Sequence, residues 1–304
     1  MIIGKQGCLP SSKMINKNKV EFFFFLVFIK LFKFIGINVT RRLGKALGTI
    51  IYFIVPVRKS VVIGNLKKAF PQKKSSEIRR IALRNYQNIT MTFFEFMCIP
   101  SCTREEILSF ATVEADPSAR SVLDENRGFI FLTAHFGSWE VSGYSLPLHL
   151  GVKFHILAQP QRNPYVNDWL RDARRAFGNE MIWVGVSVRR IFEALKNKEA
   201  IGVAADQRGP ADSPRILFMG VPTAYHLGMA NIIIRTKAKV ITGFALRNKD
   251  LSYTLKLEEL PTSGLLGDET AQSMELMRRF INIFEWYVKN YPEQYFWMHK
   301  IWKY

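Results

Sequence analysis

The chain is poor in residues that bind metals or form disulfides, with three cysteines and five histidines among 304 residues. Cys8, Cys98 and Cys102 cannot all pair, and no group of cysteines and histidines has the spacing of a zinc site. Free thiols in a reduced compartment are therefore expected. Gly-x4-Gly-Lys-Ser/Thr and Gly-x-Gly-x-x-Gly loops, which hold nucleotide phosphates, are also missing. We expect no bound metal and no cofactor.

Acidic residues are scarce at the N-terminus. The first 80 residues hold 17 lysines and arginines against two acids, Glu21 and Glu77, whereas the other 224 residues hold 26 basic and 23 acidic residues. A nucleic-acid-binding enzyme is expected to carry much of its basic charge on the folded body. Here the charge surrounds an apolar segment, which indicates an anionic membrane surface as the partner and no nucleic acid.

The apolar segment at residues 22–37 is interrupted by Lys30 and Lys33. In a helix that crosses a membrane, these two lysines would cost about 2.5–3.5 kcal/mol each, which nearly cancels the gain from the large apolar residues. Five basic residues share one side of a helical wheel, within about 120° of one another: Lys19, Lys30, Lys33, Arg41 and Lys45. This pattern predicts a helix that lies in the membrane interface with its cations toward the headgroups.

A second apolar segment covers residues 47–57 and is followed by Arg58 and Lys59. The flanking positive charges place the protein on the cytoplasmic side of a bilayer. Two core helices are the alternative interpretation, and a secretory signal is disfavoured because no small-x-small cleavage site follows. We therefore assign residues 1–60 to a basic, apolar membrane-anchoring segment and residues 61–304 to a catalytic domain.

Short apolar runs alternate with amphipathic stretches from Gly128 onward. The runs predict strands at 129–132, 154–158, 181–184, 200–204, 240–245 and 253–257. The helical periodicity predicts helices at 139–148, 163–177, 188–197, 227–236 and 270–290, after an earlier helix that begins at 75 and ends near 99. Strands that alternate with helices of this length indicate an α/β fold, with a mainly parallel central sheet flanked by helices.

The hexapeptide at 135–140 places His135 and Glu140 directly after a predicted strand. Open α/β sheets carry out their chemistry at the carboxyl ends of strands. A histidine there can take a proton from a hydroxyl, and a carboxylate can hold the imidazole in the required tautomer. We predict that His135 is a general base oriented by Glu140, and that Phe136 and Gly137 in the same turn bind substrate. A structural histidine at a strand end is the alternative.

Arg162 and Asn163 lie where a predicted helix begins. Asn163 suits the N-cap position, and the following proline suits the first helical position. Arg162 would then lie beside the positive end of a helix, where a guanidinium and free backbone N–H groups together favour a phosphate or carboxylate. We predict substrate binding by both residues, and an arginine on a solvated loop is the alternative.

Asp206 and Gln207 place a carboxylate and an amide after the strand predicted at 200–204. Asp206 could orient a substrate hydroxyl, bind Arg162 or Arg208, or merely cap its loop. We include Asp206 and Gln207 among the predicted substrate-binding residues.

An apolar loop is predicted at residues 217–223. Its glycine, Gly220, would let the backbone approach a ligand closely. Together with Phe218 it would suit an acyl chain, so we predict that both residues bind substrate.

The chain lacks the Gly-x-Ser-x-Gly elbow of covalent serine hydrolases. Ser138 lies inside the His/Glu turn, where it suits a helix N-cap. A base without an enzyme nucleophile implies that the substrate supplies the nucleophile. A lipid hydroxyl that attacks an activated acyl group meets this requirement.

Together these motifs resemble the late acyltransferases of lipid A biosynthesis, the lauroyl and myristoyl transferases, within the wider glycerolipid acyltransferase superfamily. The resemblance is carried by His-Phe-Gly-Ser-Trp-Glu at 135–140, Arg-Asn-Pro at 162–164, Arg171, Gly178, Asp-Gln at 206–207, Phe-Met-Gly-Val-Pro at 218–222 and Tyr-Pro-Glu-Gln-Tyr-Phe-Trp-Met-His-Lys at 291–300. It implies a glycerolipid acyltransferase-like fold and a site at the cytoplasmic face of the inner membrane.

The resemblance also implies the reaction. An acyl group would move from an acyl carrier protein thioester, or from acyl-CoA, to a hydroxyl of a phosphorylated glucosamine disaccharide lipid. Backbone N–H groups near Gly137, or Arg162, are the candidate donors for the oxyanion. Two alternatives are an acyltransferase that acts on a lysophospholipid or another glycolipid, and a membrane-binding protein without enzymatic activity.

Overall fold

The computed structural model describes residues 12–55, 57–185 and 188–303. Seven strands of the described chain form one sheet: β1 (Ala111–Ala115), β2 (Phe129–Thr133), β3 (Phe154–Ala158), β4 (Glu180–Trp183), β5 (Ala200–Ala204), β8 (Lys239–Arg247) and β9 (Tyr253–Glu259). Their order is β1-β9-β8-β2-β5-β3-β4. In this sheet of the described chain, only β8 and β9 pair antiparallel, and the other neighbouring strands pair parallel. The predicted mainly parallel sheet is confirmed.

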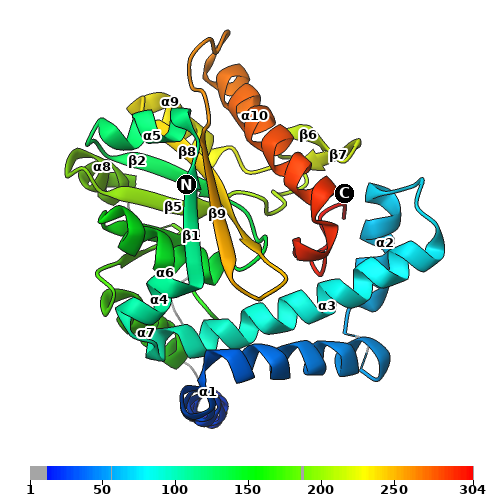
Figure 1. Cartoon of the computed structure of the whole chain (residues 1–304). Coiled ribbons are helices and arrows are strands. Elements are labelled where there is room, and N and C mark those ends of the chain that lie inside the picture. Colours follow the sequence, from blue (N-terminus) through cyan, green and yellow to red (C-terminus); the bar gives the residue numbers. More distant parts are fainter. Residues whose placement is uncertain (1–11, 56, 186–187, 304) are drawn as a thin grey trace.

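Helices cover both faces of this sheet (Figure 1). The helices of the described chain are α1 (Ser12–Phe53), α2 (Lys59–Ala69), α3 (Ser75–Cys98), α4 (Arg104–Phe110), α5 (Pro117–Asp124), α6 (Trp139–Leu150), α7 (Pro164–Arg175), α8 (Val188–Lys196), α9 (Gly228–Thr236) and α10 (Glu269–Asn290), with short 3-10 turns at Ile99–Ser101 and Pro292–Gln294. Of these, α1 and α2 pack along α3 rather than on the sheet. The predicted strands and the helices between them are all present, with ends that differ by a few residues. The described chain also contains elements that the sequence pattern did not predict, namely β1, α4, α5 and the hairpin of β6 (Arg215–Phe218) and β7 (Val221–Ala224).

Alternate residues of β2 enter two separate hydrophobic cores, as the two-residue period of a strand requires. Ile130 and Leu132 belong to the core that is covered by α8, α9 and α10. Phe129 and Phe131 belong to the core that is covered by α4, α5 and α6. Because both faces of β2 are buried, this strand is fixed in the middle of the fold, and the residues that follow it have a defined position.

The N-terminal helix α1 is divided at Gly36, where φ is 76° and ψ is 165°. Beyond this kink, α1 runs beside α3 (Figure 1). The kink turns the two halves in different directions, so a single helical wheel does not describe the whole segment. The prediction that Arg41 faces lipid headgroups is wrong, because the Arg41 side chain is buried and its Nε lies 2.6 Å from Glu95 Oε1.

Other predicted cations of α1, namely Lys19, Lys30, Lys33 and Lys45, are exposed. Many large apolar side chains of α1 and the following turn are exposed as well: Val20, Phe23, Phe24, Val27, Phe28, Leu31, Phe34, Val39, Leu43, Ile50, Phe53, Ile54, Val55 and Val57. Among the described residues, no helix combines the length and the apolar character that a membrane span needs.

Candidate active site

His135 lies two residues beyond the end of β2, opposite Asp206 at the end of β5. The register of the two parallel strands pairs Thr133 with Ala204, so the residues two positions further along both chains also face each other. Asp206 Oδ1 accepts a hydrogen bond from the His135 backbone N–H at 3.0 Å and lies 2.8 Å from His135 Nδ1. One carboxylate oxygen therefore fixes both the backbone and the ring of His135.

The second ring nitrogen of His135 is available for chemistry. The Asp206 side chain is 1% exposed, whereas that of His135 is 22% exposed. Within the described residues, Nε2 has no hydrogen-bond partner. The His135 ring packs edge-on against Trp139, with the ring centroids 5.2 Å apart, and near Phe296 at 6.2 Å. These two aromatic rings restrict the imidazole, which presents Nε2 as the position for an incoming proton.

The charges around His135 favour its protonated form. Burial lowers the pKa of His135, but the charge and hydrogen bond of Asp206, with a smaller contribution from Glu140, outweigh it and leave the pKa raised. Burial raises the pKa of Asp206, but the interactions with His135 outweigh it and leave the pKa lowered. The pair is therefore built to stabilise an imidazolium next to a carboxylate.

Glu140 does not orient the imidazole in this structure. Ser138 caps α6, its Oγ accepting from the Val141 N–H, and Glu140 lies in the first turn of that helix. Its carboxylate turns toward α7, where Oε2 lies 2.5 Å from Arg174 Nη2. The predicted contact between Glu140 and His135 is thus replaced by the Asp206 contact, because neighbouring strands bring Asp206 closer than the helix brings Glu140. Whether Glu140 takes part in catalysis stays a prediction.

Arg174 is a buried residue that the sequence interpretation did not single out. Its side chain is 5% exposed, and its guanidinium lies over the Tyr144 ring at 4.1 Å from the centroid. A Cβ on Gly143 would lie 2.4 Å from Arg174 Nη1, so the glycine leaves the space that this guanidinium fills. The available signal was helical spacing, because Arg174 lies four residues after buried Leu170 and therefore on the same face of α7.

Gly137 is the point at which the chain turns from β2 into α6. Its φ is 58°, and a Cβ there would lie 1.7 Å from the carbonyl oxygen of Ala245. The Gly137 N–H donates to the Gln294 carbonyl oxygen at 2.9 Å, and the Ser138 N–H donates to Ala245 at 3.4 Å. The Gly137 N–H itself is therefore not free to stabilise an oxyanion, because the C-terminal segment already accepts its hydrogen bond.

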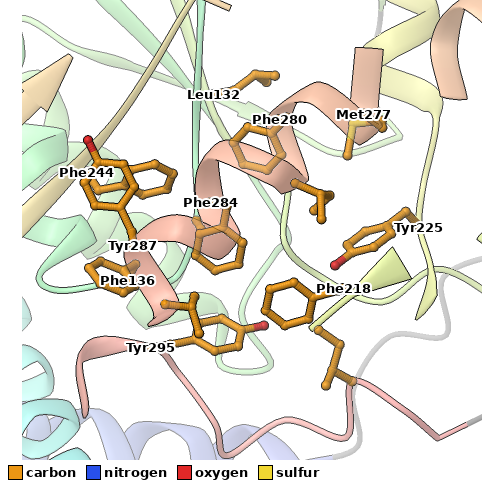
Figure 2. Packing of buried hydrophobic residues seen from close by; sticks show 14 of the residues in the cluster. Leu132, Phe136, Phe218, Tyr225, Phe244, Met277, Phe280, Phe284, Tyr287 and Tyr295 are labelled. Carbon is orange, nitrogen blue, oxygen red and sulfur yellow. The ribbon is translucent and has the colours of Figure 1, made fainter. Parts of the chain in front are cut away.

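Phe136 and Phe218 point into the hydrophobic core. Figure 2 shows both rings around Phe284 of α10, together with Tyr295. Phe136 is 1% exposed and Phe218 is fully buried. In this structure neither side chain offers a surface to a substrate, and both stabilise the elements next to His135.

The apolar loop predicted at 217–223 is instead the β6–β7 hairpin. Its two turn residues, Met219 and Gly220, both have positive φ, at 51° and 76°. This is the backbone that a two-residue hairpin turn requires, and it accounts for the glycine without a ligand. Gln207, which the sequence also predicts to bind substrate, directly follows Asp206 and is exposed.

Asn163 is the N-cap of α7, as predicted. Its Oδ1 accepts from the Tyr165 N–H at 3.1 Å, and its Nδ2 donates to the Asn18 carbonyl at 2.8 Å. The Asn163 side chain thereby joins α7 to the start of α1, which is a structural role. Arg162 precedes Asn163 and is exposed. It does not bind Asp206, which is one of the predicted roles of that carboxylate, because Asp206 bonds to His135.

The C-terminal segment forms one wall of the site. The Phe296 N–H donates to the His135 carbonyl oxygen at 3.0 Å, and Tyr295 Oη lies 2.8 Å from His299 Nε2. Burial lowers the pKa of His299 to about 4, so this second histidine is neutral near pH 7. In the part of the chain that the structure describes, no group of His, Cys, Asp and Glu side chains is arranged to hold a metal ion.

Known proteins resemble this chain over nearly its whole length. A family model described as bacterial lipid A biosynthesis acyltransferase matches residues 11–304. The chain is 24% identical over 268 residues to the lipid A biosynthesis lauroyltransferase of Escherichia coli (strain K12), which covers 86% of this chain and 84% of the relative. It is also 24% identical over 271 residues to the lipid A biosynthesis palmitoleoyltransferase of the same organism, with the same coverage.

The chain is therefore an acyltransferase, and its central sheet carries a histidine–carboxylate pair at the ends of two neighbouring strands. It belongs to the bacterial lipid A biosynthesis acyltransferase family. The resemblance expected from the motifs is confirmed.

Proposed function

We propose that this enzyme transfers a fatty acyl group from an acyl carrier protein thioester to a hydroxyl of a phosphorylated glucosamine disaccharide lipid, a lipid A precursor. The observation that carries the proposal is the His135–Asp206 pair, in which Nδ1 is held at 2.8 Å and Nε2 has no partner among the described residues. Ser138, the nearest hydroxyl in the turn, is fully buried and caps α6. The attacking hydroxyl is therefore expected to come from the acceptor.

In the proposed mechanism, His135 Nε2 removes the proton of the acceptor hydroxyl while the oxygen attacks the thioester carbonyl. The tetrahedral intermediate then collapses, the carbon–sulfur bond breaks, and the leaving thiolate takes the proton from the imidazolium. Asp206 stabilises that imidazolium. General-base assistance of this kind typically contributes about 10² to 10⁴ in rate.

The oxyanion requires hydrogen-bond donors close to His135. The first-turn N–H groups of Trp139 and Glu140 have no partner outside α6 in the described chain, so we propose them as donors. Glu140 has a second proposed role, because its charge contributes to the raised pKa of His135 while its carboxylate holds Arg174.

We further propose that α1 binds the cytoplasmic face of the inner membrane. Its exposed Phe23, Phe24, Phe28 and Phe34 can enter the headgroup region, while nearby exposed lysines interact with anionic lipids. The same basic surface would attract an acidic acyl carrier protein. The phosphates of the acceptor are expected to bind near Arg162 at the start of α7.

The test is an assay with purified protein, an acyl carrier protein thioester, and a panel of the disaccharide lipid, a lysophospholipid and another glycolipid, with product detection by mass. We expect acylated disaccharide lipid from the wild type and none from His135→Ala, with unchanged melting temperature and vesicle binding. Turnover retained in His135→Ala would overturn the mechanism, and turnover only with another acceptor would overturn the proposed substrate. Removal of the protein from its cell should lower the mass of lipid A by one acyl group.

A further inference from the structure

A buried hydroxyl on α3 holds the turn that follows His135. Thr92 is 1% exposed, and its Oγ1 donates to the Gly137 carbonyl oxygen at 3.0 Å. In the described chain this carbonyl accepts no other hydrogen bond. The Gly137 N–H is held from the opposite side by the Gln294 carbonyl. Both peptide groups of Gly137 are therefore fixed by segments distant in the sequence.

The Thr92 hydroxyl has its own orienting partner. Arg247 Nη2 donates to Thr92 Oγ1 at 2.9 Å, which occupies a lone pair of that oxygen and leaves its proton to be donated. The Asn88 carbonyl oxygen lies 3.1 Å from the same hydroxyl. Because Asn88 is four residues before Thr92 in α3, this carbonyl already accepts the regular helical bond from the Thr92 backbone N–H. The Gly137 carbonyl is the acceptor that would otherwise be buried without a donor.

Arg247 is locked by the fully buried Glu95. Its Nη1 and Nη2 lie 2.9 Å and 3.1 Å from the two carboxylate oxygens of Glu95, which also accepts from Tyr253 Oη at 2.7 Å. Burial raises the pKa of Glu95, but Arg247 and Arg41 outweigh it and leave the pKa lowered, so the carboxylate is charged. A bidentate ion pair of this kind has one strongly preferred geometry.

Resting on the proposed function, we propose that Thr92 is a positioning residue for catalysis: oriented by Arg247, it sets the peptide plane after Gly137 and thereby the placement of the His135 ring. Gly137 is in the left-handed region at φ 58°, so its peptide planes decide the direction in which β2 continues into α6. The loss of one bond at this turn would tilt the ring away from its approach to substrate. Misplacement of a catalytic group by about 1 Å can cost about 10² in rate.

The test compares Thr92→Val with Thr92→Ser and with Thr90→Val as a matched control. Thr90 is on the same helix and buried, but among the described residues its Oγ1 bonds only to the Tyr86 carbonyl, at 2.8 Å. We expect Thr92→Val to lower kcat by about 10- to 100-fold with KM nearly unchanged. Thr92→Ser should restore most of kcat, and Thr90→Val should resemble the wild type.

A second readout does not depend on the substrate. An NMR titration of the His135 ring should give a lower pKa in Thr92→Val, because the ring moves away from the Asp206 charge, and no change in Thr90→Val. If Thr92→Val does not fold, Arg247→Lys replaces it as the test. This variant keeps a positive charge beside Glu95 but loses the contact with Thr92, so it should also lower kcat and the pKa of His135. A wild-type enzyme that fails on every acceptor refutes the proposed function, whereas equal kcat and equal titration in the Thr92 and Thr90 variants overturn this inference.

Discussion

Substitution of Asp206 by asparagine tests which carboxylate supports His135, the proposed base. Asparagine keeps the shape of the side chain and can still accept the His135 backbone N–H, but it removes the charge that lies 2.8 Å from Nδ1. The charge centres of imidazolium and carboxylate at this contact are about 4 Å apart, where an effective dielectric constant of about 20 gives about 4 kcal/mol. At 1.36 kcal/mol per tenfold change, this corresponds to about 10³ in rate. We expect kcat to fall by about 10² to 10³.

The pH dependence of the same variant gives a second, signed result. In the wild type, burial lowers the pKa of His135 and the interactions with Asp206 more than offset this effect. Without the carboxylate the effect of burial dominates, so the imidazole stays neutral to lower pH. The acid limb of the kcat/KM profile should therefore move to lower pH, even as the plateau falls.

Glu140→Gln is the matched comparison, because it removes one carboxylate from the same site. The Glu140 carboxylate is bonded to Arg174 and contributes less than Asp206 to the pKa of His135. We expect a smaller shift of the acid limb in the same direction. An Asp206→Asn enzyme with kcat within about threefold of the wild type, or an acid limb that moves further in Glu140→Gln, would refute the assignment of Asp206 as the orienting residue.

Three further predictions concern stability and membrane binding. Gly137→Ala should lower the free energy of unfolding in urea by at least about 3 kcal/mol, because its Cβ would lie 1.7 Å from a carbonyl oxygen. Gly151→Ala, at φ 64° with open space around it, should lower it by about 1–2 kcal/mol, and equal losses in the two variants would contradict the steric reason. Arg174→Met should lower the free energy of unfolding in urea by about 3–5 kcal/mol, because it leaves the Glu140 charge buried without a partner. Adding Glu140→Gln should restore most of this stability, and a double variant no more stable than Arg174→Met would show that the buried charge is not responsible. The Phe34 side chain is 89% exposed. Phe34→Asp should weaken the binding to anionic vesicles, measured by sedimentation, by at least about tenfold at an unchanged melting temperature. Undiminished binding would exclude this face of α1 as the membrane-binding surface.

Much of the α/β body could be predicted because its periodicity is strong. The strands at 154–158 and 200–204 coincide with β3 and β5, since continuous apolar runs between turn residues leave little ambiguity. The β6–β7 hairpin was missed because Met219 at φ 51° occupies a turn position that methionine rarely adopts. The kink of α1 was missed because a lone glycine in a helical pattern does not by itself reveal a break.

The site was predicted in part, and the part that failed depends on strand order. His135 and Asp206 were both placed at strand ends, but the sequence does not say that β2 and β5 are neighbours. Because β2 and β5 are neighbours in the fold, the pairing of Thr133 with Ala204 brings the side chains of His135 and Asp206 together. Closeness in sequence favours Glu140 as the partner of His135, yet its place in the first turn of α6 directs the Glu140 carboxylate to Arg174.

The hydrogen bonds from the C-terminal segment to Gly137 and His135 also bear on when the enzyme becomes active during its synthesis. The ribosome makes the turn after β2 long before it makes Gln294 and Phe296, the residues whose backbone groups hold that turn in place. Strands and helices of a nascent chain can assemble as units while later segments are still missing. A partly synthesised chain would thus carry a folded sheet but an unplaced His135, and acyl transfer would begin only once the last segment has docked.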